Sequence, residues 1–190
     1  MKANNFSELK ERILASAREA QACREQYSRA YSSETAEELM EVIKDNFHWC
    51  VGNEVLTVPL IEEYKGLFSE HGIHCNESVD SGYLLADNAT VLASDNATVL
   101  ASDNATVEAS GNATVRASGN ATVRASDNAT VRASGNATVR ASGNAYITSY
   151  NTIERQLSDK AIYRIRETNT IRFVSEKLKF EKIYENRAAK

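Results

Sequence analysis

Apolar and polar positions alternate strictly between Asp87 and Tyr150, where an eight-residue unit is written eight times without an insertion. The unit reads Asp/Gly-Asn-Ala-Thr-Val-x-Ala-Ser, with Ala, Val and Ala at its third, fifth and seventh positions. Alternation with a period of two around a β-branched centre is typical of a half-buried strand. The Ser-Asp/Gly-Asn junction is a turn signal. Each octad therefore predicts one short strand and one corner.

The variable sixth position decides which face of the strand points inward. It is occupied in turn by Leu92, Leu100, Glu108, Arg116, Arg124, Arg132, Arg140 and Thr148. If this position faced the core, unpaired charges would be buried at a cost of roughly several kcal/mol each. We therefore predict that the Ala-Val-Ala face points inward and that Thr, the variable residue and Ser point outward.

A unit this short cannot bury a core alone and must stack on copies of itself. Strands joined by tight corners stack as a parallel β-solenoid, with coils about 4.8 Å apart. The thin Ala-Val-Ala filling favours two sheets pressed together in a 16-residue coil of two octads. Three octads per coil is the alternative, and the first positions from Asp103 onward (Asp, Gly, Gly, Asp, Gly, Gly) hint at it.

With these units the array resembles the octapeptide-repeat proteins of bacterial and phage-derived sequences, whose unit is close to Gly-Asn-Ala-Thr-Val-x-Ala. The resemblance covers residues 87–150. It implies a solenoid fold and an origin in a phage or mobile element, but it implies no activity. The coils are also similar in kind to the 16-residue coils of ice-nucleation proteins, although the Thr-x-Thr rows of that family are absent here.

Residues 1–72 precede the solenoid and show helical periodicity. Apolar residues recur every three or four positions over residues 6–31, and Asn5 precedes them as a cap. A second helix is predicted from Thr35 to Cys50, and a third from Pro59 to a stop at Gly72. We expect these helices to form an N-terminal cap over the lower edge of the solenoid, whose backbone groups would otherwise be unpaired.

The octad phase, carried outward from the repeats, predicts a solenoid over residues 73–174. The inward positions would then be Ile73, Cys75, Ser81, Tyr83 and Leu85 upstream, and Ile153, Leu157, Ala161, Tyr163, Ile165, Ile171 and Phe173 downstream. Two charged residues, Glu77 and Arg155, do not fit this phase, and a bulge or a short helix capped by Asn151 is expected at the second. Residues 175–190, with Leu178, Phe180 and Ile183, are predicted to fold over the upper edge as a C-terminal cap.

Composition and charge favour a folded protein without a membrane span. The hydrophobic fraction of 42% is that of a folded chain, and no apolar run approaches the roughly 20 residues of a membrane span. Residues 1–6 lead into a charged helix without a signal-peptide core, so a cytoplasmic location is expected, and three widely spaced cysteines fit the reduced thiols of that compartment. Charge is uneven: 8 Lys/Arg against 15 Asp/Glu in residues 1–86, 4 against 5 in residues 87–150, and 10 against 6 in residues 151–190.

Chemistry-bearing residues do not form a recognisable catalytic or metal motif. Two cysteines and all three histidines fall within residues 48–75 (His48, Cys50, His71, His74 and Cys75), but no Cys-x-x-Cys pair is among them. Nearly identical repeats offer the same residues at every level, which makes a lattice and not a catalytic pocket. We therefore expect no catalytic residues, no metal and no cofactor.

The expected function is that of a non-enzymatic scaffold or protein-interaction module that presents a repetitive solenoid face. With two octads per coil, one face carries Leu92, Glu108, Arg124 and Arg140, and the other carries Leu100, Arg116, Arg132 and Thr148. The candidate binding residues are the four arginines, because like charges at strand spacing repel unless they meet an anion or fan into water; a solvated face is the alternative interpretation. Alternatives are a polyanion or nucleic-acid partner, a homo-oligomer formed end to end or side by side, and an enzyme whose site lies in the helical cap.

Overall fold

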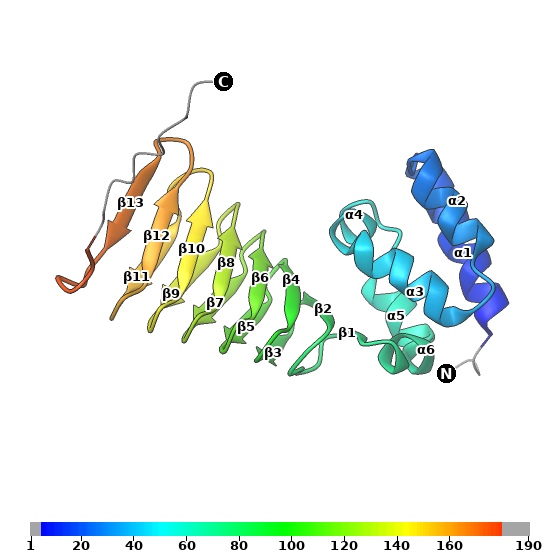
Figure 1. Cartoon of the computed structure of the whole chain (residues 1–190), viewed down its shortest axis with the longest axis horizontal. Helices are drawn as coiled ribbons and strands as arrows, with labels where there is room; N and C mark the ends of the chain where they lie inside the picture. The colour runs from blue at the N-terminus through cyan, green and yellow to red at the C-terminus, as the bar shows by residue number, and fades with distance from the viewer. Residues whose placement is uncertain (1–4, 180–190) are drawn as a thin grey trace, which may run out of the picture.

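The computed structural model describes residues 5–179, in which a set of short helices precedes a stack of short strands (Figure 1). The helices are α1 (Phe6–Glu19), α2 (Arg24–Ser32), α3 (Ala36–Asp45), α4 (Phe47–Gly52), α5 (Val58–Glu63) and α6 (Lys65–Glu70). The strands are β1 (Ile73–Cys75), β2 (Tyr83–Asp87), β3 (Thr90–Ala93), β4 (Thr98–Ser102), β5 (Thr106–Ala109), β6 (Thr114–Ala117), β7 (Thr122–Ala125), β8 (Thr130–Ala133), β9 (Thr138–Ala141), β10 (Tyr146–Ser149), β11 (Glu154–Leu157), β12 (Ile162–Ile165) and β13 (Thr170–Phe173).

The strands form a parallel β-solenoid with two sheets. Sheet A has the order β1-β2-β4-β6-β8-β10-β12-β13, and sheet B has the order β11-β9-β7-β5-β3. Successive octads therefore alternate between the sheets, and aligned residues such as Thr114 of β6 and Thr130 of β8 are sixteen positions apart. The prediction of two octads per coil is confirmed, and the alternative of three octads per coil is wrong.

The interior of the solenoid is built from small aliphatic side chains. Within the array the valines are fully buried and all but Val91 are flanked by buried alanines on both sides, as at Ala121, Val123 and Ala125. Arg124, between the last two, is exposed. The inward Ala-Val-Ala phase is thereby confirmed, and the two sheets lie close together because no larger side chain separates them.

The corners are held by a ladder of asparagines. Asn104 Nδ2 donates to Asn88 Oδ1 at 2.9 Å, and Asn136 Nδ2 donates to Asn120 Oδ1 at 3.3 Å along the same corner. The opposite corner repeats the contact, as between Asn144 and Asn128 at 3.2 Å. Each bond joins residues sixteen apart, so the amides tie one coil to the next.

The coil from β2 to β4, the first of the array, is one residue shorter than the coils that follow, and the predicted phase is wrong there. Tyr83 of β2 aligns with Thr98 of β4, a step of fifteen. Leu84 and Ala86 therefore enter the solenoid core, whereas Leu85 joins the core of the helical region. Ile73 and Cys75 of β1 are in register with Tyr83 and Leu85 and also pack with the helices. The predicted misfit Glu77 is paired with Lys65 and His74.

At the other end the predicted phase holds through β12 and then fails. Ile153, Tyr163 and Ile165 are buried in the solenoid core, with the phenol of Tyr163 plugging the last coil. The Tyr163 hydroxyl lies 2.6 Å from Ser149 Oγ and accepts a bond from the Ile153 N–H at 3.2 Å. Arg155 belongs to a strand, not to the expected bulge or helix, and its guanidinium lies over the Tyr163 ring at 5.3 Å.

The last described strand, β13, turns back and pairs antiparallel to β12. Ile171 and Phe173, predicted to face inward, are instead 45% and 43% exposed. The reversal explains this difference. The octad pattern predicts which alternate residues face inward only while the chain continues coiling in the same direction, and β13 turns back. Leu178 is partly buried, whereas the predicted cap residues Phe180 and Ile183 lie outside the described residues.

Each predicted helix is divided into two shorter ones. The first divides around Gln21, which has a left-handed backbone (φ 57°), and α2 then packs against α1. The others divide at Asn46 and Tyr64, where the helical bonding is interrupted. The predicted cap Asn5 is confirmed, because the Glu8 N–H donates to Asn5 Oδ1 at 3.3 Å. Thr35, where the second helix was predicted to begin, caps α3 in the same way, with the Glu38 N–H donating to Thr35 Oγ1 at 3.3 Å. Short helices pack around one core, whereas a 26-residue helix would extend about 39 Å.

Candidate functional site

The four candidate arginines lie in two columns on opposite sheets. Arg116 of β6 aligns with Arg132 of β8 on sheet A, and Arg124 of β7 aligns with Arg140 of β9 on sheet B. The two predicted columns are therefore confirmed as geometry. The solenoid does not bring all four arginines together, because consecutive octads face in opposite directions.

The sheet B column is largely neutralised by carboxylates. Arg124 Nη1 lies 2.9 Å from Glu108 Oε1 on the neighbouring strand. Both residues, with Arg140, line a shallow trough that also includes Asp80. Two cations and two anions therefore share this face, and no excess charge remains to attract an ion.

The sheet A column has no such compensation. Within residues 5–179 no hydrogen bond or ion pair involves the side chain of Arg116 or Arg132. The two lie on adjacent strands, so their Cα atoms are separated by about 4.8 Å. They line a groove of about 380 Å³ that also contains Arg166 and His48, and among the described residues no carboxylate lines it. We call this feature the arginine groove.

The helical region forms one wall of the arginine groove. His48, Val51 and Gly52 of α4 face Leu100 and the arginines of sheet A across it. Leu100 packs against the helical core, whereas Leu92, at the same octad position on sheet B, is 53% exposed. The helices thus cover the first strands of sheet A, whereas the first strands of sheet B stay exposed to solvent.

The positive charge of the groove affects the pKa of His48. Loss of hydration first, and then the positive charges of Arg116 and Arg132, lower the pKa of His48 from its ordinary value of 6.5. Both effects favour the neutral imidazole. At neutral pH the groove therefore carries the charge of its arginines alone.

The groove suits recognition better than covalent chemistry. An arginine guanidinium presents a planar fork that matches carboxylate and phosphate oxygens with two parallel hydrogen bonds. Two of the three serine hydroxyls that line the groove are engaged elsewhere: Ser118 Oγ donates to the Ala101 carbonyl at 3.4 Å and Ser134 Oγ to the Ala117 carbonyl at 3.3 Å. The arrangement can hold an anion next to an apolar patch formed by Leu100 and Val51.

The histidines and the two cysteines of residues 48–75 make separate contacts in the structure and do not converge on one site. His74 Nδ1 lies 2.8 Å from Glu77 Oε1, and Lys65 Nζ lies 2.7 Å from the other oxygen of that carboxylate. These contacts lower the pKa of Glu77, with Lys65 as the larger cause. Burial raises the pKa of both Cys50 and Cys75 to about 11, which keeps them as thiols. Within residues 5–179 no group of three or more His, Cys, Asp or Glu is placed to hold a metal ion.

Two groove residues were not predicted from the sequence. Arg166 follows β12 directly, and the alignment of Ser149 with Ile165 places it above Tyr150 in the column of eighth octad positions. Extending that column would have found it. No sequence pattern predicted the position of His48, because His48 and Arg116 are far apart in the chain and come close only in the fold.

Comparison of the chain with protein-family models, with curated proteins and with solved structures found no match. Among the described residues no helix is long and apolar enough to cross a membrane. The fold and the groove together define a parallel β-solenoid whose helical region lies over one sheet.

Proposed function

We propose that this chain is a non-enzymatic scaffold or protein-interaction module, and that its arginine groove receives an acidic segment of a partner protein. The observation that carries the proposal is the unbalanced, in-register pair Arg116 and Arg132 beside α4. Adjacent like charges destabilise a sheet unless an anion meets them or they spread into water. A groove wall limits that spreading, so an incoming carboxylate gains from both arginines.

A peptide partner is favoured over nucleic acid because the groove is mixed in character. Val51 and Leu100 offer apolar surface beside the cations, which suits a segment with one apolar side chain among carboxylates. The solenoid in this proposal is a rigid support, and a phage or mobile element is its proposed source.

The test is direct binding of labelled probes to the full chain. A fluorescein-labelled eight-residue peptide of glutamates around one leucine is titrated by fluorescence anisotropy at low and at physiological salt. The expected result is saturable binding that weakens with salt. The double variant Arg116→Gln/Arg132→Gln should lose at least about tenfold in affinity, whereas Arg124→Gln/Arg140→Gln, with the same charge change on sheet B, should bind as the parent does.

The same titration with a single-stranded DNA octamer addresses the nucleic-acid alternative. Tighter binding of the DNA, lost in the Arg116/Arg132 variant, would replace the peptide by a phosphate backbone as partner. Equal losses in both double variants would show that net charge alone governs binding, and would contradict the groove. The enzyme hypothesis is less well supported, because no base is bonded to the groove serines whose contacts are described above.

A further inference from the structure

The helical region contains an apolar cavity, partly open to solvent, between α2 and the three helices α1, α3 and α4. Its volume is about 220 Å³. The walls come mainly from Ile13, Ala17, Ala30, Leu39, Ile43 and Trp49. A cavity of about 150 Å³ lined by aliphatic and aromatic side chains is enough to hold benzene and stays dry when empty. This cavity is therefore of a size to take a ligand somewhat larger than benzene.

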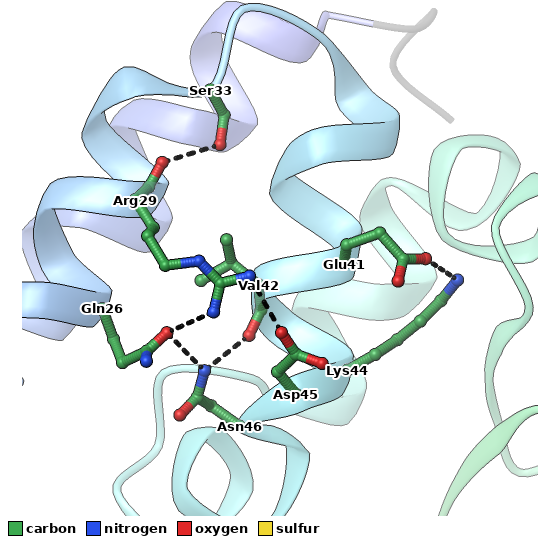
Figure 2. Close-up of polar contacts among 8 residues, drawn as sticks. All are labelled: Gln26, Arg29, Ser33, Glu41, Val42, Lys44, Asp45 and Asn46. Atoms are coloured by element: carbon green, nitrogen blue, oxygen red, sulfur yellow. Dashed lines mark hydrogen bonds and ion pairs between the residues drawn. The ribbon is translucent and has the colours of Figure 1, made fainter.

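Helix α2 covers the cavity with few buried residues of its own. Of its nine residues, Ala30 is the one that is buried. Polar side chains hold α2 to the end of α3 (Figure 2): Arg29 Nη2 donates to Asp45 Oδ2 at 2.9 Å, and Asn46 Nδ2 donates to Gln26 Oε1 at 3.1 Å. Arg29 Nη1 also donates to Gln26 Oε1 at 2.8 Å, which joins the two contacts into one network. Surface contacts of this kind are individually weak, and on its other side α2 is held to α1, where Arg18 Nη2 donates to the Tyr27 hydroxyl at 2.9 Å.

The chemistry of the lining selects for a neutral apolar molecule. In the part of the chain that the structure describes, no charged side chain lines the cavity, and its two amides, Gln26 and Asn46, bond to each other. Cys50 also lines it, and burial raises the pKa of this thiol to about 11, so that it acts as an apolar wall atom. A charged ligand would lose its hydration without gaining a partner.

We propose that this cavity is a binding site for a small uncharged aromatic or aliphatic molecule, with α2 as its cover. The site is separate from the arginine groove, although α4 contributes to both: Trp49 lines the cavity and His48 lines the groove. The occupant enters between α2 and the end of α3, where polar contacts and not packed apolar side chains close the structure.

Trp49 provides the readout, because it is the single tryptophan of the chain. Bromobenzene, a heavy-atom quencher, is titrated into the full chain while tryptophan emission is recorded. The expected result is saturable quenching. The variant Ala30→Leu, which fills the cavity from α2, should lose at least about tenfold in affinity, whereas Ser28→Leu, on the exposed side of the same helix, should bind bromobenzene as the parent does.

Ala17→Leu fills the cavity from α1 and serves as the second variant if Ala30→Leu does not fold. Folding of each variant is checked by circular dichroism and by binding of the acidic peptide in the arginine groove. Quenching that is linear in bromobenzene, unchanged in both filling variants, or equal for the anion 4-bromobenzoate would mean random collision with an exposed indole, and would overturn the proposal.

Discussion

At the residue scale, the first position of the octad shows how the corners avoid stacking like charges. Along one corner this position reads Asp95, Gly111, Asp127, Gly143 and Asp159, so the two residue types alternate from coil to coil. The Gly111 N–H donates to Asp127 Oδ2 at 3.2 Å. A Cβ on Gly111 would lie 2.8 Å from the backbone nitrogen of Asp95, and its left-handed backbone also favours glycine.

This alternation accounts for the period of three in the sequence. Read along the chain, the two corners are interleaved, and the other corner contributes Asp103, Gly119 and Gly135. The period of three therefore arises from reading the two corners together, and neither corner shows it alone. A like-charge contact does remain in the first coil, where loss of hydration and then the neighbouring Asp103 raise the pKa of Asp87.

The first prediction concerns the protonation of His48. Because the positive charges of Arg116 and Arg132 help to lower its pKa, Arg116→Gln should raise that pKa toward 6.5, and so should an acidic peptide bound in the groove. Arg140→Gln, on the opposite sheet, should leave it unchanged. The measurement is a pH titration of the His48 ring signals by NMR, and a pKa unchanged by Arg116→Gln would contradict the proximity of the two side chains.

The sign of the effect on stability follows from the same shift. A histidine whose folded-state pKa lies below its unfolded value contributes no penalty above pH 6.5. As the pH falls below 6.5, the unfolded state binds the proton first, and the free energy of unfolding decreases until the folded-state pKa is passed. Arg116→Gln should make this decrease smaller.

At the element scale, alternation and turn chemistry predicted the strands well, whereas helix lengths and the first coil were missed. The octads are predictable because eight nearly identical units fix one phase and one corner. The division of the helices at Gln21, Asn46 and Tyr64 depends on packing around a shared core, and no residue at these points is a strong helix breaker. The fifteen-residue step into β4 was missed because the aliphatic residues of β2 fit either phase.

The second prediction concerns coils as units. Deletion of residues 111–126 removes sixteen positions and joins Ser110 to Asp127, which keeps the octad phase. The shortened chain should stay folded, with a melting temperature within about 10 °C of the parent, but it should bind the acidic peptide less tightly because Arg116 is lost from the pair. Circular dichroism, thermal melting and anisotropy measure these outcomes.

Deletion of residues 111–122 is the matched control, since it removes twelve positions and brings Ser110 next to Val123 without a corner. This chain should aggregate or unfold, because the following strands no longer align with sheet A or sheet B. Equal stability of the two deletions would show that coil length does not govern the fold.

At the scale of the whole molecule, the sequence predicted a solenoid with helices before it but not which sheet the helices cover. Leu92 and Leu100 occupy the same octad position, and only the short first coil, which turns Leu85 toward the helices, directs them to Leu100 on sheet A. The arginine columns were predictable from the repeat, whereas the groove was not. It depends on α4 meeting sheet A, a contact between distant parts of the chain.

All of these inferences depend on the sixteen-residue coil, which cysteine cross-linking tests most directly. In a chain with Cys23, Cys50 and Cys75 replaced by alanine, three pairs are compared: Thr114→Cys with Thr130→Cys, with Thr122→Cys and with Thr138→Cys. Aligned residues on neighbouring strands are about 4.8 Å apart, within the Cα separation of roughly 4.4–6.8 Å that a disulfide spans.

Since Thr114 aligns with Thr130 across β6 and β8, mild oxidation should join 114 to 130 rapidly and leave the other two pairs reduced. Rapid joining of 114 to 138, with 114 and 130 left reduced, would show coils of three octads and would contradict the two-sheet solenoid together with the groove built on it.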